Sequence, residues 1–394
     1  PLLFAPLSEV YGRVRVIQLS CLIYLIFNFM CGYSTCPWQL AVCRFLSEAG
    51  GIGPVTVGAG VLEDLFPTFK RGASMAIYAL TPLLANAVSP IIGGFVAENS
   101  NWRCLFYAIT IAGTMLLLIG LMSMCETYEP KLLQDKRDML RRSTRDDRWH
   151  LDREQEPTIS AELGIAMWRP FIMFFTQPVV VVLSLYYAYL DGLSFFFFSI
   201  LRGIWEGLYN QRISMASLNS VSIMAGFIVG SQAAPLLNDR IHFHLRQKYN
   251  NLGKPEYRIP IMIPGAALVP MGILIYGWTA QYHLHWVLPN LGALVFSAGA
   301  MTGFSSMQTY VIDYYTSNSA SAIAALTVTK SFCGAGFPLF APITYEKLGF
   351  GVGNSVLAAV AALVGFPAPF LLWRFGGRLR EKSMFAIKEE DGRF

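Results

Sequence analysis

Long runs of apolar residues recur along almost the whole chain, separated by short polar segments. A run of 18 or more such residues is long enough to cross a hydrocarbon core roughly 30 Å thick. An α-helix is favoured there because it satisfies its own backbone hydrogen bonds. The pattern therefore predicts an all-α membrane protein. Ten complete spans are expected, at residues 16–36, 38–62, 73–97, 102–124, 171–199, 213–236, 260–280, 286–312, 319–342 and 352–374.

The polar stretch 126–169 divides these spans into two groups. It mixes both charges and is expected to be a partly helical cytoplasmic linker. Pro1–Pro6 resemble the end of one further span, so four spans and a fragment precede the linker and six follow it. The predicted organisation is an N-terminal bundle (1–125), the linker (126–169), a C-terminal six-helix bundle (170–375) and a cytoplasmic tail (376–394).

The composition supports a membrane protein and gives an orientation. Hydrophobic residues make up 54% of the chain and charged residues only 14%, whereas soluble domains carry about 25% charged residues. If the segment 8–15 faces the cytoplasm, the loops on that side and the tail hold 24 of the 30 Lys and Arg, against four in the opposite loops. This is a strong positive-inside signal. It also accounts for the net charge of +5, so no nucleic-acid partner is predicted.

Signatures of catalysis and of metal binding are not found in the sequence. It contains no GxxxxGK[ST], HExxH or GxSxG motif and no dinucleotide GxGxxG after a strand. The seven Cys are scattered through apolar segments without a CxxC pair. We therefore predict no enzymatic activity, no catalytic residue, no cofactor and no metal, with any driving energy coming from an ion gradient.

Nine short strings then carry a more specific signal. They are PLSEVYGRVRV (6–16), RFLSEAGG (44–51), SPIIGG (89–94), WRCLFY (102–107), ETYEPKLL (126–133), GKPEYRIPIMIPGA (253–266), YGWTA (276–280), QTYVIDYY (308–315) and YEKLGFGVGNS (345–355). In this order they resemble the major facilitator superfamily, in particular the fungal branch of its twelve-spanner drug:proton antiporters.

The resemblance implies a fold of two pseudo-symmetric helix bundles. By this alignment the sequence begins at the end of the second family helix, which implies an N-terminal truncation that also removes the first helix. It further implies export of drugs, toxins or secondary metabolites by alternating access, with protons as the coupling ion. We also predict a monomer in the plasma membrane.

A cytoplasmic gate is the first candidate site. Glu9 stands in the acidic position of the family's first-loop signature, and Gly12, Arg13 and Arg15 stand in its turn and basic positions. A weak echo follows at Asp239 and Arg240 in the second half. The predicted role is pairing across the two halves when the cytoplasmic side is closed. The alternative is a tight turn with positive-inside anchors.

Arg44 and Glu48 are the second candidate. A charge at the membrane centre costs about 2.5–3.5 kcal/mol on insertion scales, so Arg44 is expected to face the bundle interior. Glu48 replaces the small Gly that the resemblance predicts, and it shares a helix face with Arg44. Two interpretations stay open: structural compensation of the Arg44 charge, or a titratable carboxylate that takes part in proton coupling.

Further candidates lie deeper in the predicted spans. Pro90, Gly93 and Gly94 resemble the hinge of the antiporter motif, although Ser89 replaces a Gly, and ordinary small-residue packing is the alternative. Asp191 interrupts an apolar aromatic span. It either binds a proton or a cationic solute, or caps a broken helix beside Gly192. Residues predicted to line the substrate cavity are Tyr186, Tyr189, Gln308, Tyr310 and Lys330.

Three other functions remain open from the sequence. The transporter could instead take up a nutrient or polyamine with protons. A non-transporting sensor or scaffold would need a larger signalling domain than the linker and tail provide. An inactive remnant is the third possibility, because a bundle without its first helix would expose interior faces.

Overall fold

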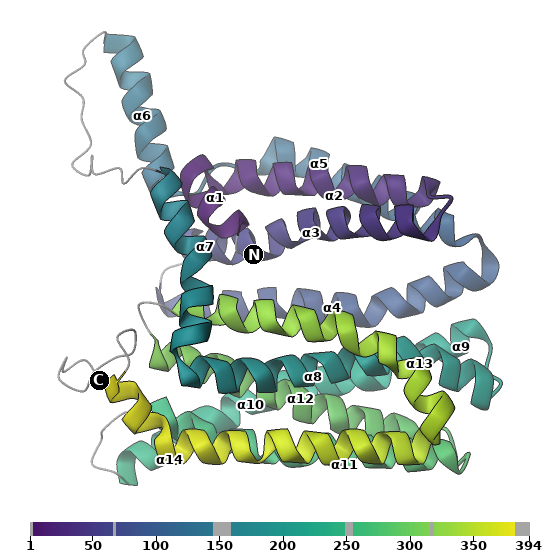
Figure 1. Cartoon of the computed structure of the whole chain (residues 1–394). Helices are drawn as coiled ribbons and strands as arrows, with labels where there is room; N and C mark the ends of the chain where they lie inside the picture. The colour runs from purple at the N-terminus through teal and green to yellow at the C-terminus, as the bar shows by residue number, and fades with distance from the viewer. Residues whose placement is uncertain (1–2, 66–67, 145–158, 249–254, 316–318, 383–394) are drawn as a thin grey trace. The chain divides into compact units, whose positions relative to one another are not determined.

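The computed structural model describes residues 3–65, 68–144, 159–248, 255–315 and 319–382. These residues contain helices and no strands (Figure 1), which confirms the predicted all-α architecture. The expected linker residues 145–158 and tail residues 383–394 lie outside the described part. The chain forms two compact units, one of Pro1–Pro82 with Val96–Trp168 and one of Leu83–Phe95 with Arg169–Phe394.

The first unit is built around α2, which packs against α3 and α5. The helices α4 and α7 are shared, because residues Leu83–Phe95 of α4 and residues 169–176 of α7 group with the second unit. The predicted linker begins with a helix, α6, whose first turn carries Glu129 and whose last turn carries Arg141 and Arg142. This distribution matches the helix dipole. The bounds are α1 Phe4–Tyr11, α2 Arg13–Tyr33, α3 Pro37–Leu65, α4 Thr68–Asn99, α5 Trp102–Ser123, α6 Glu129–Thr144 and α7 Ile159–Thr176.

The second unit is larger. In it α8 packs on α13, α13 on α11, α11 on α12 and α12 on α10. A π-helical turn, η1, follows α8, and a 3₁₀ turn, η2, precedes α11. The bounds are α8 Pro178–Gly203, η1 Ile204–Leu208, α9 Ile213–Leu218, α10 Ser220–Lys248, η2 Pro255–Ile261, α11 Met262–Gln281, α12 Val287–Tyr314, α13 Ser319–Gly365 and α14 Pro367–Lys382.

All ten expected spans lie on helices, with some ends shifted. Eight segments of the described chain are long and apolar enough to cross a membrane. One of them, Ser321–Leu379, covers nearly all of two expected spans, because α13 continues through a non-helical kink at Gly349. The expected span 73–97 on α4 is not among the eight. The expected span 171–199 is divided, since α7 ends at Thr176 and α8 starts at Pro178. Proline is favoured at a first helical position, where no intrahelical N–H bond is lost.

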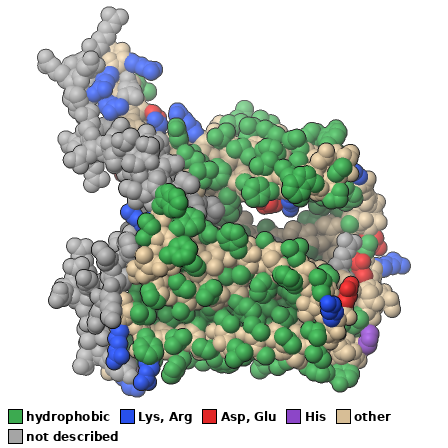
Figure 2. All heavy atoms as spheres, in the orientation of Figure 1, with side chains coloured by type: hydrophobic (Ala, Val, Ile, Leu, Met, Phe, Trp, Pro, Cys, Tyr) green, Lys and Arg blue, Asp and Glu red, His purple; other side chains and the backbone are tan. Residues whose placement is uncertain are grey.

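The apolar residues are distributed differently in the two units. The second unit has a large core that includes Trp205, Tyr276 and Phe296. The first unit has a small one around Val16, Ile17 and Val57, and no residue of α5 is buried. Figure 2 shows hydrophobic side chains over much of the visible face of the helices. Exposed apolar side chains on long apolar helices are what a lipid environment requires.

Candidate functional site

The first helix turn of α2 is held by a side chain from far along the chain. Glu126 follows α5, and its carboxylate accepts the backbone N–H of Arg13 at 2.8 Å and that of Val14 at 3.2 Å. An acidic side chain at this end of a helix satisfies orphan N–H groups and complements the dipole. Gly12 precedes the helix at φ 95° and ψ 153°. The acceptor Glu126 was not among the residues predicted to act in the gate.

The Arg13 side chain connects several elements of the first unit. Its Nε lies 3.2 Å from Asp64 Oδ2 at the end of α3, and its Nη1 donates to Ser8 Oγ at 2.8 Å. The guanidinium also lies 4.9 Å from the ring centroid of Tyr128. Arg15 is exposed, and the side chain of Glu9 lies outside the described residues. The predicted pairing of these residues across the two halves therefore stays a prediction.

Arg44 and Glu48 form an ion pair one turn apart on α3. Arg44 Nη2 lies 3.2 Å from Glu48 Oε1, and the two side chains are 48% and 60% exposed. The Arg44 guanidinium also lies 5.7 Å from the ring centroid of Phe106 on α5. The pair provides the charge compensation expected from its spacing. Proton binding by Glu48 stays a prediction.

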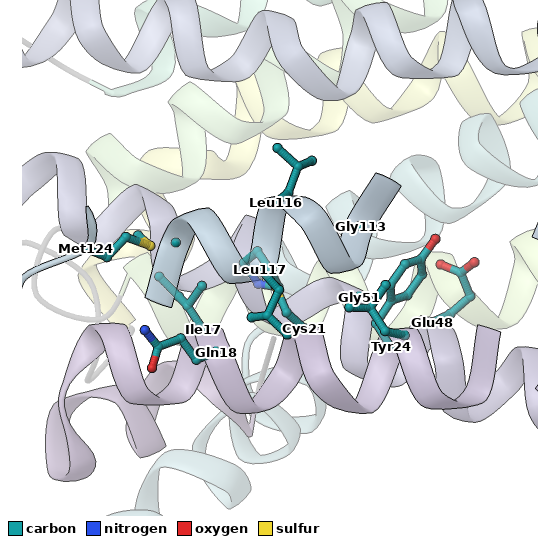
Figure 3. Close-up of a pocket in the computed structure, with 13 residues that line it drawn as sticks. Ile17, Gln18, Cys21, Tyr24, Glu48, Gly51, Gly113, Leu116, Leu117 and Met124 are labelled. Carbon is teal, nitrogen blue, oxygen red and sulfur yellow. The ribbon is translucent and has the colours of Figure 1, made fainter. Parts of the chain in front are cut away.

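A cavity of about 430 Å³ lies beside this pair, between α2, α3 and α5. Figure 3 shows Tyr24 and Glu48 at one end of its wall and Gln18 and Met124 at the other. The remaining wall is mostly apolar and includes Leu116. The only charged side chain in this lining is Glu48, so one carboxylate faces a mostly apolar cavity. Nothing in the sequence pattern indicated that these three helices surround one space.

The predicted hinge residues lie on a continuous helix. Helical geometry runs unbroken along α4 from Thr68 to Asn99, through Pro90. A Cβ placed on Gly93 would contact nothing within 4 Å, whereas one placed on Gly94 would overlap the Ser217 hydroxyl of α9. Gly94 thus permits a close helix contact. Bending at Pro90 and Gly93 remains a prediction.

Asp239 of the second-half echo belongs to a three-residue charged group with Arg258 and Asp313. Arg258 of η2 donates from Nη1 to Asp239 Oδ1 of α10 at 3.0 Å, and from Nε to Asp313 of α12. Arg240, the basic residue expected to act here, is exposed. The sequence pattern identified Asp239 but missed Arg258, although Arg258 belongs to the GKPEYRIP string that supported the family resemblance.

Four side chains meet within the apolar part of the second unit, and we call them the Asp191 cluster: Tyr187, Asp191, Gln308 and Lys330. Lys330 Nζ of α13 lies 3.7 Å from Asp191 Oδ1 of α8 and 5.5 Å from the ring centroid of Tyr187. Gln308 of α12 donates from Nε2 to the Tyr187 hydroxyl at 3.3 Å. The side chains of Lys330 and Asp191 are 30% and 14% exposed. The cluster therefore brings together three of the predicted site residues.

The three predicted cavity tyrosines are placed differently. Tyr186 and Tyr310 are 1% and 0% exposed and belong to the core of the second unit. Tyr189 is 8% exposed and donates its hydroxyl to the Leu357 carbonyl at 2.8 Å. Their placement favours a packing role, and contact with solute stays a prediction. It is Tyr187 that lies beside Lys330, one helical turn before Asp191.

Metal-ligand geometry is not found in the part of the chain that the structure describes. No group of three or more His, Cys, Asp or Glu side chains comes together there. The seven Cys are free in the structure, including Cys31 and Cys36, which flank the loop after α2.

Comparison with known proteins yields consistent matches. The model of the Major Facilitator Superfamily matches residues 1–338. The chain is 41% identical to the efflux pump vrtL of Penicillium aethiopicum, over 98% of this chain and 76% of that protein. It is 38% identical to the MFS-type transporter oryF of Aspergillus oryzae, over 97% of this chain and 79% of that protein. Among solved structures, the inward-open xylose transporter XylE of E. coli aligns with a TM-score of 0.63 at 14% identity, over 98% of this chain and 83% of that chain.

Proposed function

The chain belongs to the major facilitator superfamily and is a multi-pass membrane transporter, and from this premise we propose that it exports small organic molecules in exchange for protons. The direction of transport is supported by its relatives, since vrtL and radE of Floropilus chiversii are named efflux pumps. This chain is 36% identical to radE, over 98% of this chain and 72% of radE. We further propose that it acts in the plasma membrane as a monomer, without a catalytic step.

The observation that carries proton coupling is the Asp191–Lys330 ion pair. Asp191 lies near the midpoint of α8, a 26-residue helix, and therefore near the middle of a span. Ionisable residues at that depth are costly and generally functional. The Asp191 carboxylate can pair either with the Lys330 ammonium or with a proton. It can therefore change its charge and still have a positive partner. Arg44 and Glu48 provide a second pair with the same capacity in the first unit.

Transport into inverted membrane vesicles tests this function. The lumen of such vesicles corresponds to the cell exterior. When the lumen is acidic, a transporter that exchanges protons for solute lets protons leave the lumen and accumulates its substrate inside. We expect accumulation of rhodamine 6G or of fluorescein, dyes that share a planar xanthene ring but differ in charge. A protonophore should abolish it. Failure to accumulate either dye with an acidic lumen, or accumulation only with an alkaline one, contradicts export by proton exchange.

Substitutions then assign the coupling residues. Asp191→Asn and Arg44→Ala are each expected to remove most of the dependence of transport on the pH gradient. Asp135→Asn is the matched control, because Asp135 also pairs with a lysine, Lys131, at 3.3 Å, but on α6 outside the spans. Unchanged pH dependence in both test variants would exclude the proposed coupling roles.

A further inference from the structure

The Asp191 cluster has the composition of a site for an organic cation. On α8, Tyr187, Asp191 and Phe195 are spaced four residues apart and therefore share one helix face. Gly334 of α13 lies against this face, because a Cβ placed on it would be 3.1 Å from both Asp191 Oδ2 and a ring carbon of Phe195. A carboxylate between two aromatic rings favours an ammonium group through charge pairing and cation–π attraction.

An ammonium group already occupies this position. Lys330 Nζ lies both near the carboxylate of Asp191 and over the ring of Tyr187. Its distance to Asp191, 3.7 Å, is longer than the 2.7–2.9 Å typical of a charge-assisted hydrogen bond. The Lys330 side chain is about twice as exposed as that of Asp191, at 30% against 14%. Lys330 therefore pairs with Asp191 at a longer distance than an optimal charge-assisted hydrogen bond. Its flexible four-carbon stem allows its charge to move away from the carboxylate.

We propose that Lys330 is a tethered substitute for the amino group of the transported solute, which is an aromatic amine in its protonated form. The solute's ammonium displaces Lys330 from Asp191, and Lys330 returns when the solute leaves. This inference rests on the proposed transport function and adds the chemical class of the substrate. It also explains why an apolar helix pair holds a lysine directly beside an acidic partner.

The Asp191 carboxylate also determines that solute and proton are transported in opposite directions. The titratable or charged groups that face Asp191 are Tyr187 of its own helix and Lys330 and Cys333 of α13, while α12 contributes the neutral Gln308 through Tyr187. One negative charge accepts one positive partner: the Lys330 ammonium, the solute ammonium or a proton. Binding of the solute cation and binding of a proton therefore exclude each other, which is the condition for antiport.

An anionic solute is disfavoured at this position. An anion that paired with Lys330 would lie beside the carboxylate of Asp191, and like charges at such separations repel. Binding would then be strongest when Asp191 is protonated. Anion and proton would bind together, which produces transport in the same direction and not exchange.

Dye binding to the purified full chain in lipid nanodiscs tests the inference separately from transport. Rhodamine 6G is an aromatic cation and fluorescein an anion on the same ring system. Lys330→Met keeps the stem and removes the ammonium, so we expect it to bind rhodamine 6G about tenfold more tightly than the wild type, equivalent to 1.4 kcal/mol. An increase in affinity cannot result from misfolding. Lys131→Met is the matched control, because it breaks the Lys131–Asp135 pair on α6 and should leave the affinity unchanged.

Two further measurements complete the test. Asp191→Asn should lose rhodamine 6G binding, and acidification should weaken binding to the wild type. The proposal is overturned if Lys330→Met lowers the affinity for rhodamine 6G or leaves it unchanged, if neither protein binds this dye, or if fluorescein binds and requires Lys330.

Fluorescein transport without rhodamine 6G transport would likewise reject the cation site while leaving proton-driven export intact. Absence of proton-driven transport together with the expected binding pattern would reject export and leave the cation site intact.

Discussion

Gly12 occupies a backbone conformation that side chains rarely adopt. Its φ of 95° and ψ of 153° fall in a region that is essentially restricted to glycine, where other residues store about 1–3 kcal/mol of strain. A Cβ there would also lie 2.9 Å from the carboxyl carbon of Glu126, the side chain that caps α2. We expect Gly12→Ala to destabilise the protein by about that amount, measured as a lower thermal unfolding midpoint in detergent micelles.

Gly203 provides the control for this substitution. It lies at the end of α8 with a helical φ of −61°, and a Cβ placed on it would contact nothing within 4 Å. Gly203→Ala should leave the midpoint unchanged or raise it slightly, because alanine is the better helix former. Equal midpoints for the two variants would show that neither the φ of Gly12 nor its contact with Glu126 matters to stability.

The sequence predicted which side chains pair only where the two residues lie close together in the chain. The Arg44–Glu48 pair follows from a spacing of four residues on one predicted helix. The partners of Asp191 and Arg13 do not follow from spacing, since Lys330 and Glu126 lie on other segments more than 100 residues away. Identifying them requires the packing of α8 on α13 and of α2 against the end of α5, which no local pattern determines.

The helices α11 and α12 approach each other closely along a seam of glycines. A Cβ placed on Gly272 would lie 2.6 Å from Phe296 Cα and 2.8 Å from the Gly292 carbonyl oxygen. Both contacts are with backbone atoms, which cannot rotate away. Membrane helices rely on such small-residue interfaces, because lipid gives no hydrophobic drive for association.

We therefore expect Gly272→Ala to push α11 and α12 apart and to cost about 1–3 kcal/mol, the usual range for overpacking. The measurement is the fraction of purified chain that remains monodisperse on size-exclusion chromatography after heating. Gly336→Ala on α13 is the matched control, since a Cβ there meets no atom within 4 Å. A Gly272→Ala chain as heat-resistant as the control would mean that the seam tolerates a methyl group.

The sequence predicted the existence of the helices better than their ends and interruptions. Apolar runs of 18 or more residues are long enough to identify a span without any tertiary information. The division between α7 and α8, however, depends on the single residue Gln177 and on Pro178 starting a helix. The kink in α13 likewise depends on Gly349, whose φ of 70° ends one helical run before the next begins. Hydropathy averaged over a window does not detect single-residue features of this kind.

At the scale of the whole molecule, the expected division into two bundles stays a prediction, and the boundaries of the compact units fall within two helices, α4 and α7. Residues 1–125 were assigned to one bundle from the position of the polar linker, whereas Leu83–Phe95 of α4 groups with the second unit. The close contact of Gly94 with Ser217 of α9 is part of that grouping. A linker marks where the chain passes between bundles, but it contains no information on which surface a particular helix contacts.

The orientation of the chain in the membrane can be tested with its own cysteines. Cys36 and Cys125 are exposed and lie at opposite ends of α2. Cys36 follows the C-terminal end of this helix, whereas Cys125 precedes Glu126, which caps its N-terminal end. At 1.5 Å per residue the 21 residues of α2 extend about 32 Å, enough to cross the hydrocarbon core. Cys104 is also exposed and lies on the Cys36 side, because the adjacent Arg103 donates to the Ser34 carbonyl.

The excess of Lys and Arg on the side of residues 8–15 predicts that this side is cytoplasmic. An impermeant maleimide added to intact cells should therefore modify Cys36 and Cys104 and leave Cys125 unmodified, as read by mass spectrometry of the peptides. Inverted vesicles should give the opposite pattern, and detergent-solubilised protein should be modified at all three. Modification of Cys125 alone in intact cells would reverse the orientation and with it the direction assigned to transport. Equal modification of Cys36 and Cys125 in sealed membranes would show that α2 does not separate them across the bilayer.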